Sequence, residues 1–204
     1  MRYDPRRHVW AAFSVADVRS LFGGCPARWW LSGGWAIDHW LGAVSRRHGD
    51  IDVSSLRPAL PALLSSLPTR LRPFAAMSGH LLPLGEHLDD PELHNIWIHD
   101  EDGDRFVLQI NLEDGDESVW RYRRDPRITL RWSSAVATVC GVPTGTPATQ
   151  LLWKARSPRP QDEHDLNVAH GLLRPDEHRW LLRAIRTAHP RSPWADEPRR
   201  AATC

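Results

Sequence analysis

Two aspartates of this 204-residue chain, Asp50 and Asp52, are well suited by type and spacing to bind a metal ion. The alternation of polar and apolar side chains over residues 49–53 predicts a strand, and alternate residues of a strand face the same side. Two carboxylates held side by side repel each other unless a cation neutralises them, and oxygen ligands favour Mg²⁺. An isolated Asp-x-Asp segment is more often a solvated strand edge, but Ile51 and Val53 require a core on the opposite face.

A glycine pair precedes these acids. Ser32-Gly33-Gly34 follows a short apolar run, and Asp50 lies 16 residues after Gly34. Because Gly33 and Gly34 lack side chains, backbone N–H groups at the start of the next helix could approach an anion. A Gly-Gly pair alone usually marks only a turn, but a phosphate cradle beside a divalent-metal strand is typical of phosphoryl or nucleotidyl transfer.

The elements that must position these residues form an α/β (α+β) pattern. Capping residues predict a helix over residues 14–22, and a strand, a glycine turn and a helix follow over residues 29–41. Further along, the pattern predicts a helix over residues 58–67, strand segments near residues 94–99, 105–113, 118–123 and 135–140, and helices from residue 147 onward. We therefore expect one domain over residues 1–140 and a small helical domain over residues 141–204.

Composition limits the partners and the location of the protein. The 26 basic and 25 acidic residues leave a net charge of +1, which argues against a nucleic-acid partner. No apolar run approaches the roughly 18 residues of a membrane span, and residues 1–7 are not followed by the apolar segment of a signal peptide. The three cysteines, Cys25, Cys140 and Cys204, fit neither a disulfide framework nor a zinc site. We expect a reduced, cytoplasmic protein whose oligomeric state the sequence leaves open.

Several motifs together resemble the aminoglycoside and lincosamide nucleotidyltransferase family, whose fold is shared with polymerase β-like enzymes. The resemblance extends over roughly residues 28–194. It rests on Leu31-Ser32-Gly33-Gly34-Trp35-Ala36-Ile37-Asp38, Arg46-Arg47-His48-Gly49-Asp50-Ile51-Asp52, Trp120-Arg121-Tyr122-Arg123-Arg124-Asp125-Pro126, Leu151-Leu152-Trp153-Lys154-Ala155, and residues 159–165 with Trp180-Leu181 behind them.

The resemblance implies a nucleotidyltransferase-fold mixed sheet with flanking helices, followed by a small C-terminal helical domain. It also implies an Mg²⁺-dependent enzyme that moves a nucleoside monophosphate from a nucleoside triphosphate to a hydroxyl group of a small molecule and releases pyrophosphate. ATP is the first expectation for the nucleotide, and an aminoglycoside-type or lincosamide-type antibiotic is the first expectation for the acceptor.

Roles for individual residues follow from the same resemblance. Asp50 and Asp52 would hold the Mg²⁺ ions, two in number, that bridge the triphosphate and the attacking oxygen. Ser32, Gly33 and Gly34 would line the phosphates, and Arg46 and His48 could offset charge on the leaving pyrophosphate. For Arg46 and its neighbour Arg47, a solvated loop is an equal alternative.

Lys154 is the one lysine among the 26 basic residues, and it lies in a helix that matches the family. A compact ammonium group suits a phosphate differently from a planar guanidinium, so we favour a contact with the triphosphate. The alternative is that the single lysine remains by chance and has no role in phosphate binding. Downstream, Asp162 and Asp165 are expected to pair the helical part with the rest of the chain.

The third acid of the fold is the weak point of the match. Enzymes of this fold commonly carry a third carboxylate on a neighbouring strand, as metal ligand or general base. The expected strand at residues 106–113 has Gln109 at that position, and a glutamine cannot accept a proton. Glu113 lies two pleats further and is the candidate catalytic acid; the alternative is that it begins the turn at residues 113–116.

Charge distribution suggests where the acceptor binds. Residues 86–117 hold 12 of the 25 acids and one base, Arg105, and a segment this acidic attracts cations. The hypothesis is that Glu86, Asp89 and Asp90 help to bind a small cationic, hydroxylated acceptor. The alternative is a set of solvated hairpin loops. A basic stripe follows, comprising Arg121, Arg123, Arg124, Arg127 and Arg131.

Two other functions stay open. The acceptor could be an RNA or a protein, as for toxin-like members of this fold, and the basic stripe keeps that hypothesis alive. The chain could also be a catalytically lapsed nucleotide-binding module, which Gln109 favours.

Overall fold

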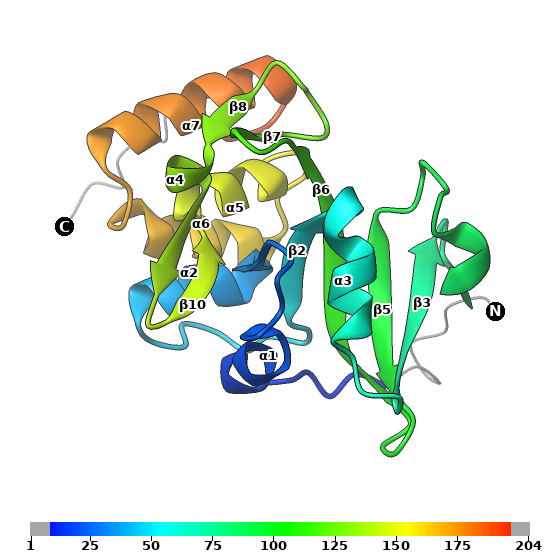
Figure 1. Cartoon of the computed structure of the whole chain (residues 1–204). Helices are drawn as coiled ribbons and strands as arrows, with labels where there is room; N and C mark the ends of the chain where they lie inside the picture. The colour runs from blue at the N-terminus through cyan, green and yellow to red at the C-terminus, as the bar shows by residue number, and fades with distance from the viewer. Residues whose placement is uncertain (1–8, 197–204) are drawn as a thin grey trace.

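The computed structural model describes residues 9–196 (Figure 1). Residues 1–7 and Cys204, used in the sequence argument, lie outside this range. The strands are β1 (Trp29–Ser32), β2 (Asp52–Leu56), β3 (Leu71–Met77), β4 (His80–Pro83), β5 (Asn95–Asp100), β6 (Arg105–Gly115), β7 (Val119–Arg121), β8 (Thr129–Arg131), β9 (Val136–Val139) and β10 (Val142–Gly145). The helices are α1 (Val15–Phe22), α2 (Gly33–Leu41), α3 (Leu60–Ser65), α4 (Trp132–Ala135), α5 (Pro147–Lys154), α6 (Pro160–His170) and α7 (Pro175–Ala188), with 3₁₀ turns at Arg57–Ala59 and Leu84–His87.

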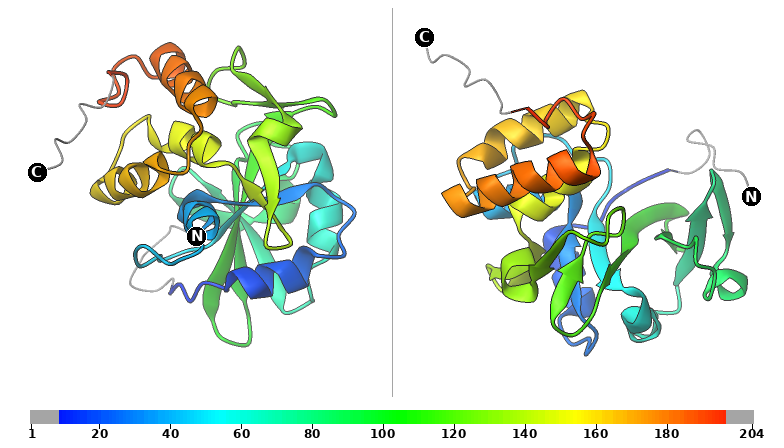
Figure 2. Two further views of the ribbon diagram at one scale, coloured as in Figure 1. Left: turned by 90° about the vertical axis from the view of Figure 1, so that its left-hand side faces the viewer. Right: turned by 90° about the horizontal axis from the view of Figure 1, so that it is seen from above.

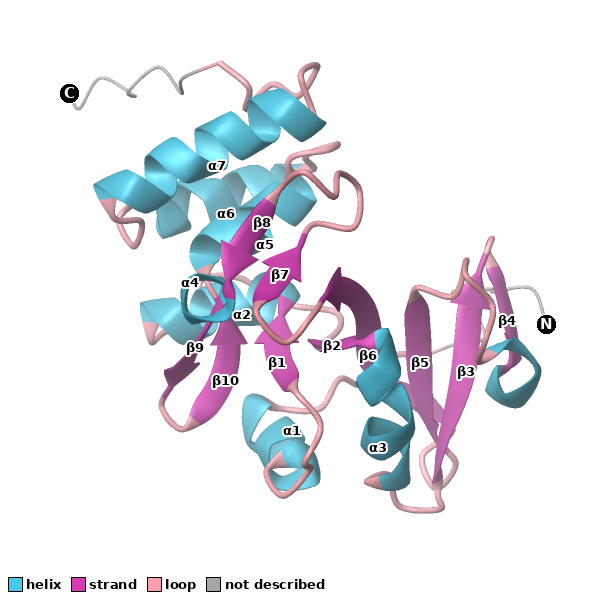
Figure 3. Cartoon of the chain, turned by 45° about the horizontal axis from the view of Figure 1, so that its top comes forward, coloured by secondary structure: helices cyan, strands magenta, loops and turns pink. Residues whose placement is uncertain are grey.

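The strands form a mixed sheet in the order β4-β3-β5-β6-β2-β1-β10-β9, and β7 and β8 extend it from the end of β6 (Figure 3). The pairs β2–β6 and β1–β10 are parallel, whereas the other pairs are antiparallel. The α/β mixed-sheet fold class with flanking helices is therefore confirmed.

Helices cover both faces of the sheet, so its central strands are apolar on both sides. Trp29 and Leu31 of β1 belong to one core, with Val18 of α1 and Leu63 of α3. Trp30, which points the other way, belongs to a second core formed with α2, α5 and α7. The helices α5, α6 and α7 lie together on this second side (Figure 2).

Two local predictions need correction. The strand expected over residues 49–53 begins only at Asp52 and continues to Leu56. The reason is that β1 ends at Ser32, opposite Asp52, and turns into α2, so Asp50 has no partner on β1. The strand β10 was not anticipated; it pairs with β1 through Leu31 and Thr144 and carries the sheet to Gly145. No helix among residues 9–196 is long and apolar enough to cross a bilayer.

The second core should carry a large share of the stability. Leu151 of α5 is fully buried there, so Leu151→Ala should lower the free energy of unfolding by about 2–5 kcal/mol. Leu41 is 38% exposed, and Leu41→Ala should cost well under half as much. Urea unfolding of the two variants at equal protein concentration measures the difference. Equal losses would contradict the placement of α5 against the sheet.

Candidate active site

The β1–α2 turn brings the backbone into contact with the acidic strand. Gly33 has φ = 68°, a conformation that favours glycine, and a Cβ there would collide with Oδ2 of Asp52. A Cβ on Gly34 would collide with the guanidinium group of Arg46. The glycine pair is therefore required by close approach as well as by backbone conformation, and it lets the start of α2 lie against the Asp52 carboxylate.

A relay of amide groups supports Asp52 from the neighbouring strands. Gln109 lies in register with Asp52 on the parallel strand β6, as expected from the sequence. The indole of Trp97 donates to Oε1 of Gln109 (2.6 Å), and Gln109 donates to Oδ1 of Asn111 (2.7 Å). Asn111 then donates to Oδ1 of Asp52 (3.2 Å). Gln109 thus supplies a hydrogen-bonded support at the position where the family resemblance led us to expect an acid.

Asp50 and Asp52 form the electrostatic centre of the site. Burial and, next, the negative charge of Asp50 together raise the pKa of Asp52 to about 7, against the hydrogen bond from Asn111 and the charges of Lys154 and Arg159. Within residues 9–196 neither aspartate makes a salt bridge. The pair is therefore two carboxylates without a contacting protein cation, which is the situation that a bound cation relieves.

The loop that carries Asp50 is held from behind by a buried aspartate. Asp38 of α2 is 3% exposed and accepts hydrogen bonds from the backbone N–H (3.0 Å) and hydroxyl (2.6 Å) of Ser45. Nε2 of His48 lies 2.6 Å from Oδ2 of Asp38, and the His48 ring stacks on Trp35. His48 therefore faces Asp38 and is not among the residues that line the pocket. This position favours a role of His48 in positioning the loop over the expected contact with pyrophosphate.

Arg46 is also absent from the pocket lining, although its guanidinium group lies beside Gly34. Its guanidinium group donates to both oxygens of Asp165 on α6, at 2.7 and 2.8 Å. Asp165 is fully buried and also pairs with Nζ of Lys154 at 2.9 Å. Lys154 makes a second ion pair with Asp162 at 2.8 Å. The prediction that an aspartate links the C-terminal helices to the rest of the chain is therefore confirmed for Asp165, whereas the ion pairs of Asp162 stay within the C-terminal part.

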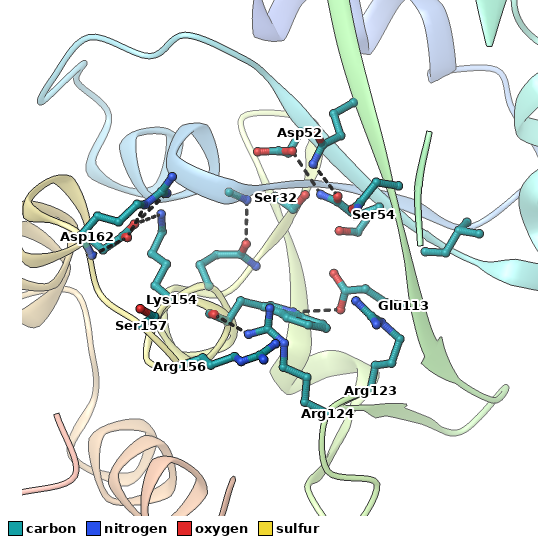
Figure 4. Close-up of a pocket in the computed structure, with 18 residues that line it drawn as sticks. Ser32, Asp52, Ser54, Glu113, Arg123, Arg124, Lys154, Arg156, Ser157 and Asp162 are labelled. Carbon is teal, nitrogen blue, oxygen red and sulfur yellow. Dashed lines mark hydrogen bonds and ion pairs between the residues drawn. The ribbon is translucent and has the colours of Figure 1, made fainter. Parts of the chain in front are cut away.

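A pocket of about 400 Å³ joins these groups (Figure 4). Of the residues predicted from sequence, it is lined by Ser32, Gly33, Asp52, Glu113 and Lys154, whereas Gly34, Arg46, His48 and Asp50 lie outside its lining. Residues that the sequence did not single out for the site also line it: Ser54, Asn95, Asn111, Gln150, Trp153, Arg156 and Ser157. Gln150 accepts a hydrogen bond from the N–H of Gly33 (2.8 Å), and nothing in its type or spacing marked it.

Glu113 lies in strand β6, which continues to Gly115, so the interpretation of Glu113 as the start of a turn is wrong. The carboxylate is 4% exposed, and its Oε2 accepts the indole N–H groups of Trp120 (2.5 Å) and Trp153 (3.3 Å). Burial raises the pKa of Glu113, and the indole hydrogen bonds and the charge of Arg123 only partly oppose that effect.

The acidic segment does not form the pocket wall that the sequence suggested. Of its 12 acids, only Glu113 lines the pocket; Glu86, Asp89 and Asp90 do not. Other members pair with surface arginines, as Asp100 does with Arg70 at 2.6 Å. Most of the segment is therefore solvated or ion-paired surface, and its charge gives no support for a cationic acceptor.

The oxygen donors of the site suit Mg²⁺ only together with a nucleotide. No group of three or more His, Cys, Asp or Glu side chains that could hold a metal occurs in the described part of the chain. Magnesium is, however, commonly bound by one or two carboxylates together with substrate phosphates and water. The two aspartates beside a helix N-terminus fit a magnesium–nucleotide complex, and do not fit a cage made of protein ligands alone.

The chain has the nucleotidyltransferase fold. One similar solved structure is the lincosamide antibiotic adenylyltransferase LnuA with lincomycin bound. The match covers 85% of this chain and 100% of the LnuA chain, with 15% sequence identity and a TM-score of 0.55. The match to ANT(2″)-Ia in complex with adenylyl-2″-tobramycin covers 85% of this chain and 95% of that chain, with 15% sequence identity and a TM-score of 0.57. The match to the solution structure of the antibiotic-resistance factor ANT(2″)-Ia covers 85% of this chain and 89% of that chain, with 17% sequence identity and a TM-score of 0.54.

Sequence comparison points to the same group. The model of the aminoglycoside-2″-adenylyltransferase family matches residues 14–77, a segment that includes the glycine pair and both aspartates. A search of curated protein sequences gives no significant match. The resemblance to aminoglycoside and lincosamide nucleotidyltransferases is therefore confirmed.

Gly33→Ala tests the close approach of the turn. The new Cβ would meet the Asp52 carboxylate and force a left-handed alanine, so nucleotide affinity should fall at least about tenfold and the protein should lose about 1–3 kcal/mol of stability. Gly171→Ala is the matched control, because a Cβ there meets nothing within 4 Å. Isothermal titration and urea unfolding give the two quantities; unchanged binding in Gly33→Ala would refute the close approach.

Asp52→Asn should stabilise the metal-free protein as pH rises. The pKa of Asp52 is about 7 in the folded protein and about 3.9 in an unfolded chain, so its contribution to stability is lost as pH rises through 7. The variant should therefore gain about 2–3 kcal/mol, or about 5–10 °C in Tm, relative to the wild type between pH 5 and pH 8 in EDTA. Thermal unfolding across that range measures the gain, and a pH-independent difference would count against the raised pKa.

Proposed function

We propose that the protein is an Mg²⁺-dependent nucleotidyltransferase. It moves a nucleoside monophosphate, with ATP as the first candidate donor, onto a hydroxyl group of a small molecule and releases pyrophosphate. Aminoglycoside-type and lincosamide-type antibiotics are the first acceptors to test, because the similar solved structures hold an adenylyl-tobramycin and lincomycin. The observation that carries the proposal is the pair Asp50 and Asp52, without a contacting protein cation, beside the glycine turn.

Asp50 and Asp52 would hold the metal, with two ions as the working hypothesis. When bound, Mg²⁺ would neutralise charge on the triphosphate and favour the nucleophilic form of the acceptor hydroxyl. The hydroxyl of Ser32 is buried without a protein partner and lines the pocket, so it can donate to a phosphate oxygen. The N-terminus of α2 and the ammonium group of Lys154 would bind the remaining phosphate charge.

Glu113 is the candidate proton acceptor. Gln109 cannot take a proton, and Glu113 is the one buried carboxylate of the pocket beyond Asp52 and the ion-paired Asp162. It lies about 13 Å along β6 from the level of Asp52, which places it at the far end of the pocket. As the bond from the acceptor oxygen to the α-phosphorus forms and the bond to the leaving pyrophosphate breaks, the hydroxyl proton would pass through water in the pocket to Glu113.

Pyrophosphate release tests the reaction. Each of the four nucleoside triphosphates is combined with Mg²⁺ and a panel of aminoglycosides and lincosamides. Acceptor-dependent release should fall at least about 100-fold in Asp52→Asn. Asp89→Asn, a surface change outside the pocket, should leave the rate unchanged. Nucleotide binding without release for any acceptor would favour the lapsed module, for which Gln109 is the supporting observation.

Glu113→Gln separates proton transfer from binding. The variant keeps the indole hydrogen bonds to the side-chain oxygen but cannot take a proton, so kcat should fall about 10²–10⁴-fold while the KM of the nucleotide stays within about twofold. The acidic limb of the wild-type pH profile, which reports the raised pKa of Glu113, should disappear. A preserved kcat would exclude Glu113 as the base.

A further inference from the structure

Three arginines form a wall of the pocket that lies across from Asp52 (Figure 4). They are Arg123, Arg124 and Arg156, and we call them the arginine wall. None of the three makes a salt bridge within the described residues, whereas Lys154 and Arg159, on another side of the pocket, are paired with Asp162. The wall therefore carries positive charge that the protein has not neutralised by contact.

Neutral groups hold two of these side chains in place. The guanidinium groups of Arg123 and Arg124 lie over the Trp153 ring, at 5.4 and 5.0 Å from its centroid. Arg124 also donates to the carbonyl oxygen of Trp153 at 3.0 Å. Nε of Arg123 is buried and lacks a hydrogen-bond partner. An aromatic ring and a carbonyl fix the positions of guanidinium groups without cancelling their charge, and one N–H donor is left for a ligand.

The wall is separate from the cations expected to serve the triphosphate. The charges of Lys154 and Arg159 act on Asp52, whereas Arg123 acts on Glu113 at the other end of the pocket. Burial and the neighbouring Arg124 lower the pKa of Arg123, in keeping with poorly compensated charge. If Glu113 accepts the proton of the acceptor hydroxyl, the wall faces the acceptor.

We propose that the arginine wall binds an anionic group, a carboxylate or a phosphate, on a small hydroxylated acceptor. The planar fork of arginine matches both anions with paired hydrogen bonds, and three adjacent guanidinium groups would repel a polycation. The proposal rests on the proposed function and narrows its acceptor class: it excludes polycationic aminoglycosides and favours acceptors that carry negative charge.

The first test uses inorganic phosphate as the probe. Phosphate is titrated into protein saturated with Mg²⁺ and α,β-methylene ATP, which occupies the triphosphate end, and the Arg123 Nε–Hε resonance is followed by NMR. Phosphate should shift this resonance with millimolar or better affinity, and the affinity should fall at least tenfold in Arg124→Gln and in Arg156→Gln. Arg131→Gln, an exposed arginine outside the pocket, is the control and should bind as the wild type does.

The second test compares acceptors by charge. Tobramycin should bind at least tenfold more weakly than phosphate to the nucleotide-saturated protein and should not support pyrophosphate release. Loss of phosphate binding when the nucleotide analogue is present would assign the wall to the nucleotide and overturn the proposal. Tight tobramycin binding that the arginine substitutions do not weaken would also overturn the proposal. Binding of tRNA that Arg131→Gln weakens as much as Arg124→Gln and Arg156→Gln do would overturn it too, because it would indicate a nucleic-acid surface.

The two proposals fail differently. Absence of nucleotide binding and of pyrophosphate release with every acceptor would refute the proposed function. The phosphate titration without nucleotide would then still report whether the arginine wall binds an anion. Thermal unfolding is measured for each variant. A Tm within about 2 °C of the wild-type Tm excludes misfolding as the cause of lost binding.

Discussion

The buried carboxylate of Asp165 is the constraint on which the arrangement of the site depends. It binds Arg46 of the loop that leads to Asp50 and Lys154 of α5, so one fully buried group joins the acidic loop to the helix that carries the cation. Burial alone would raise the pKa of Asp165, but hydrogen bonds from Arg46 and Lys154 lower it overall. Because removing one partner would leave a buried charge uncompensated, the loop and the helix are held in a fixed relation.

The same chain leaves other charges without partners at the places where substrates are expected. Among residues 9–196, Asp50 and Asp52 have no ion-pair partner, and neither do the three arginines of the arginine wall. Each arrangement costs stability in the free protein and becomes favourable once an ion of opposite charge binds. The contrast with the fully paired Asp162 and Asp165 separates the structural charges of this fold from those available for ligands.

Much of the fold and part of the site could be predicted from the sequence. Gly33 and Asp52 were found because close backbone approach and strand alternation leave residue-type signatures. The family resemblance put Gln109 at the position of the third acid, and the structure places it in register with Asp52. The partners of Arg46 and His48, Asp165 and Asp38, could not be predicted, because sequence shows that a cation is near the acids but not which way it points. Arg123 and Arg124 could not be separated from their neighbours in an arginine-rich stretch, since only tertiary packing against Trp153 brings them to the pocket.

The central claim is that Asp50 and Asp52 hold a metal–nucleotide complex against the glycine turn. A crystal structure with Mn²⁺ and α,β-methylene ATP, using the anomalous signal of manganese, tests it directly. The account predicts an anomalous peak bound by both aspartates, with the phosphates beside Gly33 and Lys154. Manganese elsewhere, or a triphosphate bound away from the glycine turn, would contradict it.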